Sequence, residues 1–358
     1  MHIQIQTFTV HKRFALKISR GTTAQTTNIW VKIEQDGIEG WGEASPFSIG
    51  EQPQTTEAIA RSLQAIAPLL KAIHPLERQR IDQLFAQAKL PSAARAAIDI
   101  ALHDWLGKSI NLPLWKLWGL ERDRIVPTSV TIGINTPQGA NQRVKDWLGK
   151  GTIESPLQDI QALKVKLGSP EGIEADQAMF EAVQEAAPNI AQISVDANGG
   201  WTVETALKMA HWLSDRKVTY IEQPLPKGQE TELTKLFYLS PLPIFVDESC
   251  FTSRSIPSLC DRVHGINIKL MKSGGLSEAL RMIHVAKAND LKVMFGCYSD
   301  SALMNSAIAQ LSPLADYLDL DSHLNLIDDP FIGASFQNGR VIPSDRPGIG
   351  VTLRRQSC

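Results

Sequence analysis

The fold is decided by the stretch ALKVKLGSPEGIEADQAMFEAVQEAAPNIAQISVDANGG (162–200), in which one helical segment joins two strand-like runs. Both runs are mostly apolar on their two faces, which is typical of parallel strands that are covered by helices. The same rhythm recurs in SVTIGI (129–134), VTYIEQP (218–224), PIFVDES (243–249), INIKLMK (266–272), KVMFGCY (292–298) and YLDLDSH (317–323). These eight units predict an α/β fold built on a (β/α)8-type, TIM-like barrel.

The regions on either side of the barrel have different patterns. Residues 1–45 alternate polar and apolar side chains around Asp36-Gly37, a pair typical of a β-hairpin turn, and residues 55–120 show helical spacing. The tail FQNGRVIPSDRPGIGVTL (336–353) returns to strand and turn chemistry. We therefore expect an α+β capping domain over 1–125 that is completed by the tail 327–358, and a barrel over 126–326.

Composition excludes several classes of protein. The 358 residues include 36 Lys and Arg against 38 Asp and Glu, so the net charge is −2 and no basic block is present for nucleic acid. No apolar run approaches the length of a membrane span, and MHIQIQTFTVHKR (1–13) resembles a strand and not a signal peptide. The four cysteines, Cys250, Cys260, Cys297 and Cys358, lack CxxC spacing. The sequence predicts a soluble, reduced, cytoplasmic protein.

Acidic residues close three successive predicted strands. Asp196, Glu222 and Asp247 follow one another at intervals of 26 and 25 residues, close to one strand-helix unit each. Because the carboxyl ends of barrel strands gather at one face, we expect the three carboxylates to converge there. A set of oxygen ligands suits Mg²⁺. The alternative is that each acid caps a helix or forms a salt bridge.

Three lysines accompany these acids. Lys164 and Lys166 are two residues apart in a strand, so both side chains should enter the barrel interior, and Lys269 enters from the other side of the ring. Neighbouring ammonium groups near a dication should have lowered pKa values, which would suit general bases. Bases on two faces of a carbon could remove a proton from one face and return it to the other. The alternative is that Lys164 and Lys166 extend outward to solvent.

The last predicted strand carries a second acidic pair, Asp319 and Asp321, on one face. Their charge could hold a cationic group of a substrate, such as an α-ammonium. On pattern alone, the alternative that they cap a loop at the strand end is equally open.

Several motifs together resemble one known family. They are GWGEASP (40–46), SAARAAIDIALHDWLGKSINLPLWKLWG (92–119), LKVKLG (163–168), DANGGW (196–201), IEQPL (221–225), VDES (246–249) and NIKLMKSGG (267–275). The combination resembles the enolase superfamily, and within it the muconate-lactonizing subgroup and its dipeptide epimerases. The predicted seventh strand has no histidine, which argues against the mandelate-racemase-like branch.

The resemblance assigns a role to each candidate residue. It implies that Asp196, Glu222 and Asp247 are Mg²⁺ ligands. It implies that Lys166 and Lys269 are the two acid/base catalysts and that Lys164 supports the enolate oxygen. It also implies that Asp319 and Asp321 hold the N-terminal ammonium of a dipeptide, a feature that distinguishes dipeptide epimerases from other members of the subgroup.

The implied activity is that of an isomerase, a Mg²⁺-dependent dipeptide epimerase. It would transfer a proton at the α-carbon of the C-terminal residue of a dipeptide such as L-Ala-D/L-Glu. The alternatives are an o-succinylbenzoate synthase or a muconate cycloisomerase of the same subgroup, and, in another class, a non-catalytic binding or structural barrel. The expected partner is a small-molecule dipeptide, with no nucleic acid and no membrane, and a homo-oligomer stays open.

Specificity depends on residues outside the catalytic set. Arg20 aligns by position with the arginine that pairs with a glutamate side chain in L-Ala-D/L-Glu epimerases, although it could also be a solvated surface charge. Tyr298 is expected to line the pocket. Two departures from the family pattern could change which dipeptide fits: Gly133 stands where those enzymes have a serine, and the segment GKGTIESPLQDIQA (149–162) has no evident counterpart.

Overall fold

The computed structural model describes residues 1–49, 53–151, 157 and 159–354. Its N-terminal part is a three-stranded antiparallel sheet of β1 (His2–Ile18), β2 (Gly21–Gln35) and β3 (Ile38–Ala44). Asp36 and Gly37 both have positive φ angles, 56° and 74°, and join β2 to β3 as a tight hairpin. The Asp-Gly turn is therefore confirmed. Arg20 lies in the two-residue tip of the β1–β2 hairpin, where Ile18 pairs with Gly21.

Helices follow this sheet in the chain, and two of them, Thr56–Leu70 and Ser92–Ser109, pack against its strands. The helices are α1 (Thr56–Leu70), α2 (Arg78–Gln87), α3 (Ser92–Ser109) and α4 (Leu114–Leu117), followed by the 3₁₀ helix η1 (Arg122–Arg124). Gly40 and Gly42 of β3 lie directly against the backbone carbonyls of Ala101 and Ala97 in α3. A Cβ atom at either glycine would clash, so this part of the motif GWGEASP is explained by the close packing of α3 on the sheet.

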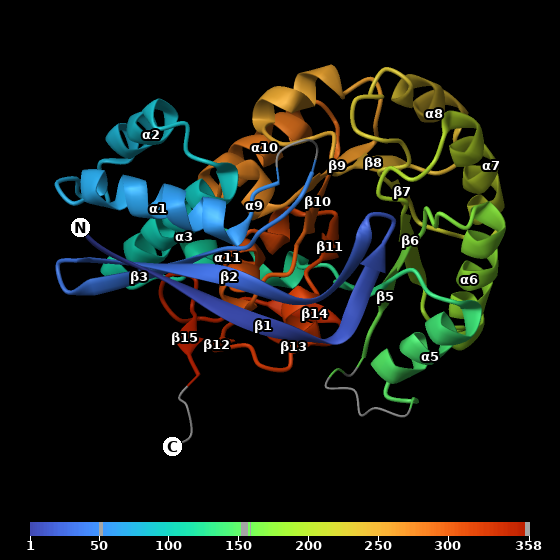
Figure 1. The fold of residues 1–358 in the computed structure, drawn as a ribbon, viewed down its shortest axis with the longest axis horizontal. Helices are drawn as coiled ribbons and strands as arrows, with labels where there is room; N and C mark the ends of the chain where they lie inside the picture. The colour runs from blue at the N-terminus through green and yellow to red at the C-terminus, as the bar shows by residue number, and fades with distance from the viewer. Residues whose placement is uncertain (50–52, 152–156, 158, 355–358) are drawn as a thin grey trace.

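A barrel of eight parallel strands forms the rest of the core (Figure 1). Its strands are β4 (Ser129–Ile132), β5 (Ala162–Lys166), β6 (Gln192–Asp196), β7 (Ile221–Glu222), β8 (Ile244–Val246), β9 (Gly265–Ile268), β10 (Lys292–Gly296) and β11 (Tyr317–Asp319). They follow chain order around the sheet, and a parallel bridge between Thr128 and Leu318 joins its two ends. All eight predicted strands are confirmed, which confirms the expected barrel fold.

Helices connect the strands on the outside of the barrel. They are α5 (Pro137–Trp147), α6 (Ile173–Ala186), α7 (Val203–Ser214), α8 (Leu233–Leu239), α9 (Leu270–Ser273), α10 (Leu276–Ala288) and α11 (Ala302–Ala309). Two connections depart from the ideal pattern within the described residues. Between β8 and β9 the chain forms only the 3₁₀ helix η2 (Ser253–Ser258), and β11 is followed by the 3₁₀ helix η4 (Ser322–Asn325). A third 3₁₀ helix, η3 (Ser312–Leu314), precedes β11.

The C-terminal segment returns to the N-terminal part. It contains β12 (Phe331–Ile332), β13 (Ser335–Gln337), β14 (Arg340–Ile342) and β15 (Thr352–Leu353), in which β12 pairs with β15 and β13 with β14. The backbone N–H of Ile349 donates to Asp104 of α3 at 2.8 Å, and Gly348 forms a bridge with Pro113. The tail thus completes the packing around α3.

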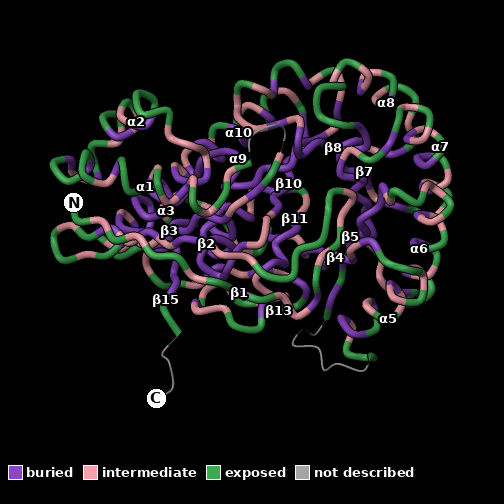
Figure 2. The backbone as a smooth tube through the Cα atoms, viewed as in Figure 1, coloured by how far each residue is buried: buried purple, intermediate pink, exposed green. Residues whose placement is uncertain are grey.

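Burial is greatest in the barrel strands and in α3, α9 and α11, whereas the other helices outside the barrel expose one face (Figure 2). Among the described residues, no helix is long and apolar enough to cross a membrane. Cys250, Cys260 and Cys297 are free thiols. Of the unusual segment 149–162, residues 152–156 and 158 lie outside the described residues.

Candidate active site

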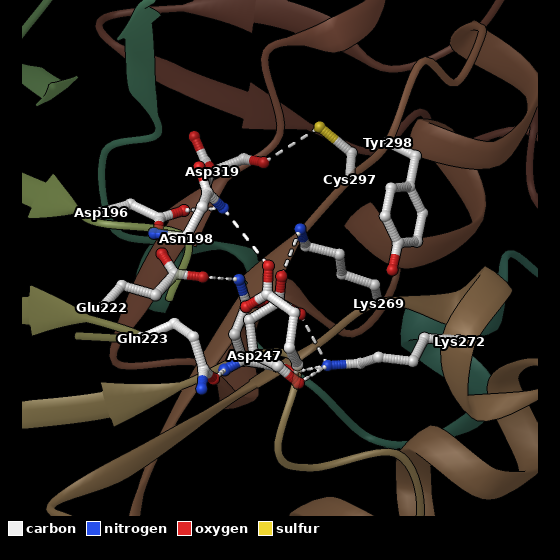
Figure 3. Close-up of polar contacts among 12 residues, drawn as sticks. Asp196, Asn198, Glu222, Gln223, Asp247, Lys269, Lys272, Cys297, Tyr298 and Asp319 are labelled. Carbon is white, nitrogen blue, oxygen red and sulfur yellow. Dashed lines mark hydrogen bonds and ion pairs between the residues drawn. The ribbon is translucent and has the colours of Figure 1, made fainter. Parts of the chain in front are cut away.

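Most of the predicted site residues meet at the carboxyl ends of the barrel strands, and Figure 3 shows Asp196, Glu222, Asp247, Lys269 and Asp319 among them. Asp196 and Glu222 end β6 and β7, while Asp247 and Lys269 directly follow β8 and β9. Lys166 pairs in register with Asp196, and Asp196 pairs with Glu222, so these side chains leave neighbouring strands at one height. Lys166, Asp196 and Glu222 therefore lie on one level of the barrel.

Each lysine forms an ion pair with a carboxylate of the same ring. Lys166 Nζ lies 2.6 Å from Asp196 Oδ2, and Lys269 Nζ lies 2.8 Å from Asp247 Oδ2. Lys164 lies deeper, with no exposed side-chain area, and its Nζ contacts Glu222 Oε2 at 2.5 Å and Asp319 Oδ2 at 2.7 Å. Three buried ammonium groups thus balance the charge of the three strand-end carboxylates, so the alternative that Lys164 and Lys166 extend to solvent is wrong.

These ion pairs determine the direction of the pKa shifts of the three lysines. Burial alone would lower the pKa of Lys164, but the negative charges of Asp319 and Glu222 outweigh it and raise the pKa well above 10.5. The pKa values of Lys166 and Lys269 are also raised, by Asp196 and Asp247 respectively, against the opposing effect of burial. Each ammonium contacts a carboxylate, which explains these raised pKa values, and the lowering predicted for lysines near a dication stays a prediction.

Lys272 is a functional-site residue that the sequence analysis missed. Its buried Nζ donates to Asp247 Oδ1 at 2.6 Å, to the Asp247 carbonyl at 2.5 Å and to the Asn267 carbonyl at 3.0 Å. Burial would raise the pKa of Asp247, but Lys269 and Lys272 together hold it well below 3.8. The available signal was NIKLMKSGG (267–275), in which Lys272 follows Lys269 by one short helical turn.

Amide side chains also orient the acids, and the sequence analysis had given them no role. Asn198 donates to Asp196 through its backbone N–H at 2.7 Å and its side chain at 3.1 Å, and Asn267 Nδ2 donates to Glu222 at 2.6 Å. Gln223, whose φ angle is +36°, accepts a hydrogen bond from the backbone N–H of Asp247 at 2.9 Å. These contacts restrain the acids before any ligand binds.

The oxygen-rich ring fits a hydrated divalent cation. Within the described residues, no three His, Cys, Asp or Glu side chains are already arranged as a metal-binding group, and each ring acid is paired with a lysine. However, Glu248 Oε2, Asn198 Oδ1 and Asn267 Oδ1 are buried without a hydrogen-bond partner beside these acids. Unpaired acceptors require donors, and the water ligands that Mg²⁺ usually retains would supply them.

The two acids at the end of β11 lie beside Lys166. Asp319 and Asp321 line one small cavity of about 50 Å³ together with Lys12, Lys166 and Cys297. Asp321 accepts a hydrogen bond from the backbone N–H of Thr131 at 2.7 Å. Burial and the charge of Asp319 raise the pKa of Asp321 to about 6.

A larger cavity of about 670 Å³ joins the two catalytic candidates, because Lys166 and Lys269 both line it. Tyr298 also lines it; its ring stacks on Phe47 with centroids 4.8 Å apart and lies 4.7 Å from Lys269 Nζ. Arg20 reaches this cavity from the hairpin tip, but its Nη2 already contacts Glu248 Oε1 at 2.8 Å. The structure therefore brings Tyr298 and both lysines together and places Arg20 at the rim.

Comparison with known proteins covers nearly the whole chain. Residues 148–357 match the family described as Enolase C-terminal domain-like, and residues 3–119 match the Mandelate racemase / muconate lactonizing enzyme, N-terminal domain. A hydrophobic dipeptide epimerase of Flavobacteria bacterium (strain MS024-2A) is 45% identical over 97% of each chain. The L-Ala-D/L-Glu epimerase of Bacteroides thetaiotaomicron is 36% identical over 95% of this chain and 84% of its own.

A solved structure shares the fold. It is the dipeptide epimerase of Cytophaga hutchinsonii complexed with Mg and the dipeptide D-Ala-L-Val. It superposes with a TM-score of 0.89 at 27% identity, covering 99% of this chain and 95% of that one.

Proposed function

Because the chain belongs to the enolase superfamily, as a member of its mandelate racemase / muconate lactonizing enzyme family, we propose that it is a Mg²⁺-dependent dipeptide epimerase. The resemblance found in the sequence motifs is thereby confirmed. One observation carries the proposal: Lys166 and Lys269 line the same 670 Å³ cavity from strands four places apart in an eight-stranded barrel. An α-carbon placed between them has one amine on each face.

The reaction is a 1,1-proton transfer at the α-carbon of the C-terminal residue. One of the two lysines, as the neutral amine, takes the α-proton on its Nζ, and the other, as the ammonium, returns a proton from the opposite face. The residue is then inverted without a net change in atoms. Lys164, held by Glu222 and Asp319 beneath the cavity, supplies a fixed positive charge for the carboxylate oxygen that gains electron density.

Asp196, Glu222 and Asp247 would hold the divalent ion. When bound, Mg²⁺ supplies positive charge that stabilises the extra negative charge on the substrate carboxylate and weakens the hold of these acids on Lys166 and Lys269. Asn198, Asn267 and Lys272 keep the acids in place through the hydrogen bonds described above. Their role is positioning.

We assign the ammonium of the dipeptide to Asp319 and Asp321. The assignment is supported by their place beside Lys166 in one cavity, at the end of β11, which lies two strands from both β5 and β9. Asp319 already shares its charge with Lys164, so Asp321 has more of its charge available for the substrate. Neither a dehydrating nor a lactonizing enzyme of the same family needs this pair.

Two classes of dipeptide are candidate substrates. The Bacteroides relative is named for L-Ala-D/L-Glu, and the Flavobacteria relative is named for hydrophobic dipeptides. Tyr298, Phe47, Leu16 and Ile18 give the large cavity apolar walls, whereas Arg20 brings a positive charge to its rim. Four further points stay predictions. They are a cytoplasmic location, the absence of nucleic acid and membrane partners, a homo-oligomer, and the domain limits at 125/126 and 326/327.

The proposal predicts that variants of the two catalytic lysines lose epimerisation. Wild-type protein with Mg²⁺ in D2O should incorporate one deuterium at the C-terminal α-carbon of an accepted dipeptide and lose optical purity. Lys166→Ala and Lys269→Ala should each abolish epimerisation, by at least about 10³-fold, because each removes the base of one face. Mass spectrometry and chiral chromatography of single stereoisomers measure both effects.

Lys235→Ala is the matched control, since Lys235 is exposed on α8 and pairs only with Glu232 within the described residues. It should retain full activity. Epimerisation at the wild-type rate in either active-site variant contradicts the two-base assignment. Dehydration of a succinylbenzoate precursor without any dipeptide exchange would instead identify the synthase of the same subgroup.

A further inference from the structure

Arg20 is already neutralised by a residue of the barrel. Its Nη2 lies 2.8 Å from Glu248 Oε1, and its Nη1 donates to the Asn198 carbonyl at 2.9 Å. The Glu248 side chain is only 5% exposed, whereas that of Arg20 is 42% exposed. The guanidinium that could recognise an acidic substrate side chain is therefore engaged in an internal ion pair.

This ion pair lies between two cavities. The 670 Å³ cavity holds Lys166 and Lys269, and a neighbouring cavity of about 430 Å³ is lined by Glu248 and Lys227 among others. Arg20 and Asn198 line both cavities, so they form part of the wall between them. A substrate side chain that extends from the reacting α-carbon toward the tip of the β1–β2 hairpin would therefore meet Arg20, which is paired with Glu248.

The charges around the large cavity show which cation could bind an acidic substrate side chain. Among the described residues that line it, Arg20, Lys166 and Lys269 are the cations. The two lysines are assigned to the proton transfer, so Arg20 alone is left to balance a carboxylate on the substrate side chain. If Arg20 turned to such a carboxylate, Glu248 would stay buried without its cation, next to Asp247, and with Oε2 already unpaired. An uncompensated buried carboxylate is strongly unfavourable.

We propose that Glu248 sets the charge preference of the enzyme by holding Arg20, so that dipeptides with an uncharged C-terminal residue are preferred over acidic ones. This inference rests on the proposed function and specifies its substrate class. Specificity of this kind arises from an element that disfavours the wrong ligand, here the buried carboxylate that competes for the guanidinium. The apolar walls of the cavity favour the same class of substrate.

The test compares two isosteric dipeptides, L-Ala-L-Gln and L-Ala-L-Glu, whose side chains differ in charge and hardly in size. Wild-type kcat/KM should be at least about tenfold higher for L-Ala-L-Gln. Glu248→Gln keeps the length of the side chain but removes its charge, which leaves the Arg20 guanidinium available. The Glu-to-Gln substrate ratio should then rise at least about tenfold, and the second substitution Arg20→Met should remove this gain.

Glu248→Asp is the matched control, because it keeps the negative charge and should not raise the ratio. Circular dichroism and the calorimetric affinity for Mg²⁺ check that the variants fold and keep the neighbouring acids in place. If Glu248→Gln is inactive, calorimetric Kd values of that variant for the two dipeptides give the same ratio.

A wild-type preference for L-Ala-L-Glu that Arg20→Met abolishes would overturn the inference, and so would an unchanged ratio in Glu248→Gln. Either result leaves the epimerase assignment intact, because exchange still occurs. Absence of exchange with every dipeptide in the wild-type protein would instead overturn the proposed function, and this inference with it.

Discussion

The buried ammonium group of Lys272 donates three hydrogen bonds, and two of them go to Asp247. Its side chain has no exposed area, and that of Asp247 is 1% exposed. Such a pair contributes little compared with a well-packed apolar pair, but removing one partner leaves the other charge buried and uncompensated. The stability of the protein should therefore respond strongly to the loss of this single amine.

We expect Lys272→Met to lower the free energy of unfolding by about 3–5 kcal/mol. The substituted side chain fills a similar volume, so the loss reflects the unpaired Asp247 and the Asn267 carbonyl more than a cavity. Urea denaturation followed by circular dichroism measures the change.

The exposed pair of Lys235 and Glu232 provides the comparison for this experiment. Lys235→Met should change stability by no more than about 1 kcal/mol, as is usual for surface ion pairs. A similarly small loss for Lys272→Met would show that Lys269 alone compensates Asp247.

Single residues also show where the sequence was informative. Asp196, Glu222 and Asp247 were predicted as one group because strand periodicity fixes which side chains reach the carboxyl face of a barrel. The partner of Arg20 could not be predicted, because Glu248 is distant in the sequence and no pattern links the hairpin tip to the end of β8. The pairing of each lysine with a particular acid likewise depends on side-chain packing and not on spacing.

At the scale of elements, Glu43 joins β3 to the start of α11. It accepts hydrogen bonds from the backbone N–H groups of Ser301 and Met304, both at 3.0 Å, and from Asn28 Nδ2 at 2.7 Å. Despite these donors, burial and the nearby charges of Asp300 and Asp329 raise the pKa of Glu43 to about 8. A glutamate on the N-terminal sheet thus caps a helix of the barrel while largely protonated at neutral pH.

This shift predicts a pH-dependent stability. Between its ordinary pKa of 4.5 and the folded value of about 8, the folded state retains a proton that the unfolded state has lost. The contribution of Glu43 is therefore complete below pH 4.5 and decreases as the pH rises toward 8, by up to about 1.4 kcal/mol per pH unit.

Glu43→Gln isolates this effect, because it cannot titrate. The free energy of unfolding of the wild type minus that of Glu43→Gln should fall from pH 5 to pH 8 in urea denaturation series. Asp300 and Asp329 titrate in both proteins, so their contribution largely cancels. A difference that stays constant over this range would show that Glu43 is ionised in the folded state throughout.

Elements also differ in how well the sequence predicted them. The barrel strands were predicted correctly because each combines an apolar run with a polar end. The β1–β2 hairpin tip was not predicted, since Thr22, Thr23 and their polar neighbours do not show which face is buried. The reason for glycine at position 133 is visible only in the structure. A Cβ atom there would lie 3.0 Å from the Lys17 backbone, so glycine allows the β1–β2 hairpin to lie close to the barrel.

At the scale of the whole molecule, metal binding should stabilise the fold. The three ring carboxylates come from three different barrel strands, so an ion that binds them links these strands in the folded state and not in the unfolded chain. Mg²⁺ at 100 times its Kd should raise the free energy of unfolding by about 2.7 kcal/mol. Urea denaturation with Mg²⁺ and with EDTA gives this difference.

Asp196→Asn tests where the ion acts, since it removes one ring charge. Its stability should no longer depend on Mg²⁺ over the same concentration range. If the wild type is equally stable with Mg²⁺ and with EDTA, the ring does not bind this ion.

The return of the tail to α3 has a consequence for biosynthesis. Helix α3 leaves the ribosome early, yet Asp104 receives its hydrogen bond from Ile349 and Pro113 forms its bridge with Gly348. This module, which is translated before the barrel, is thus completed only when residues 348 and 349 have been translated. Nascent chains stalled before that point should be clients of chaperones, whereas the same module becomes resistant to proteases once the last segment is released.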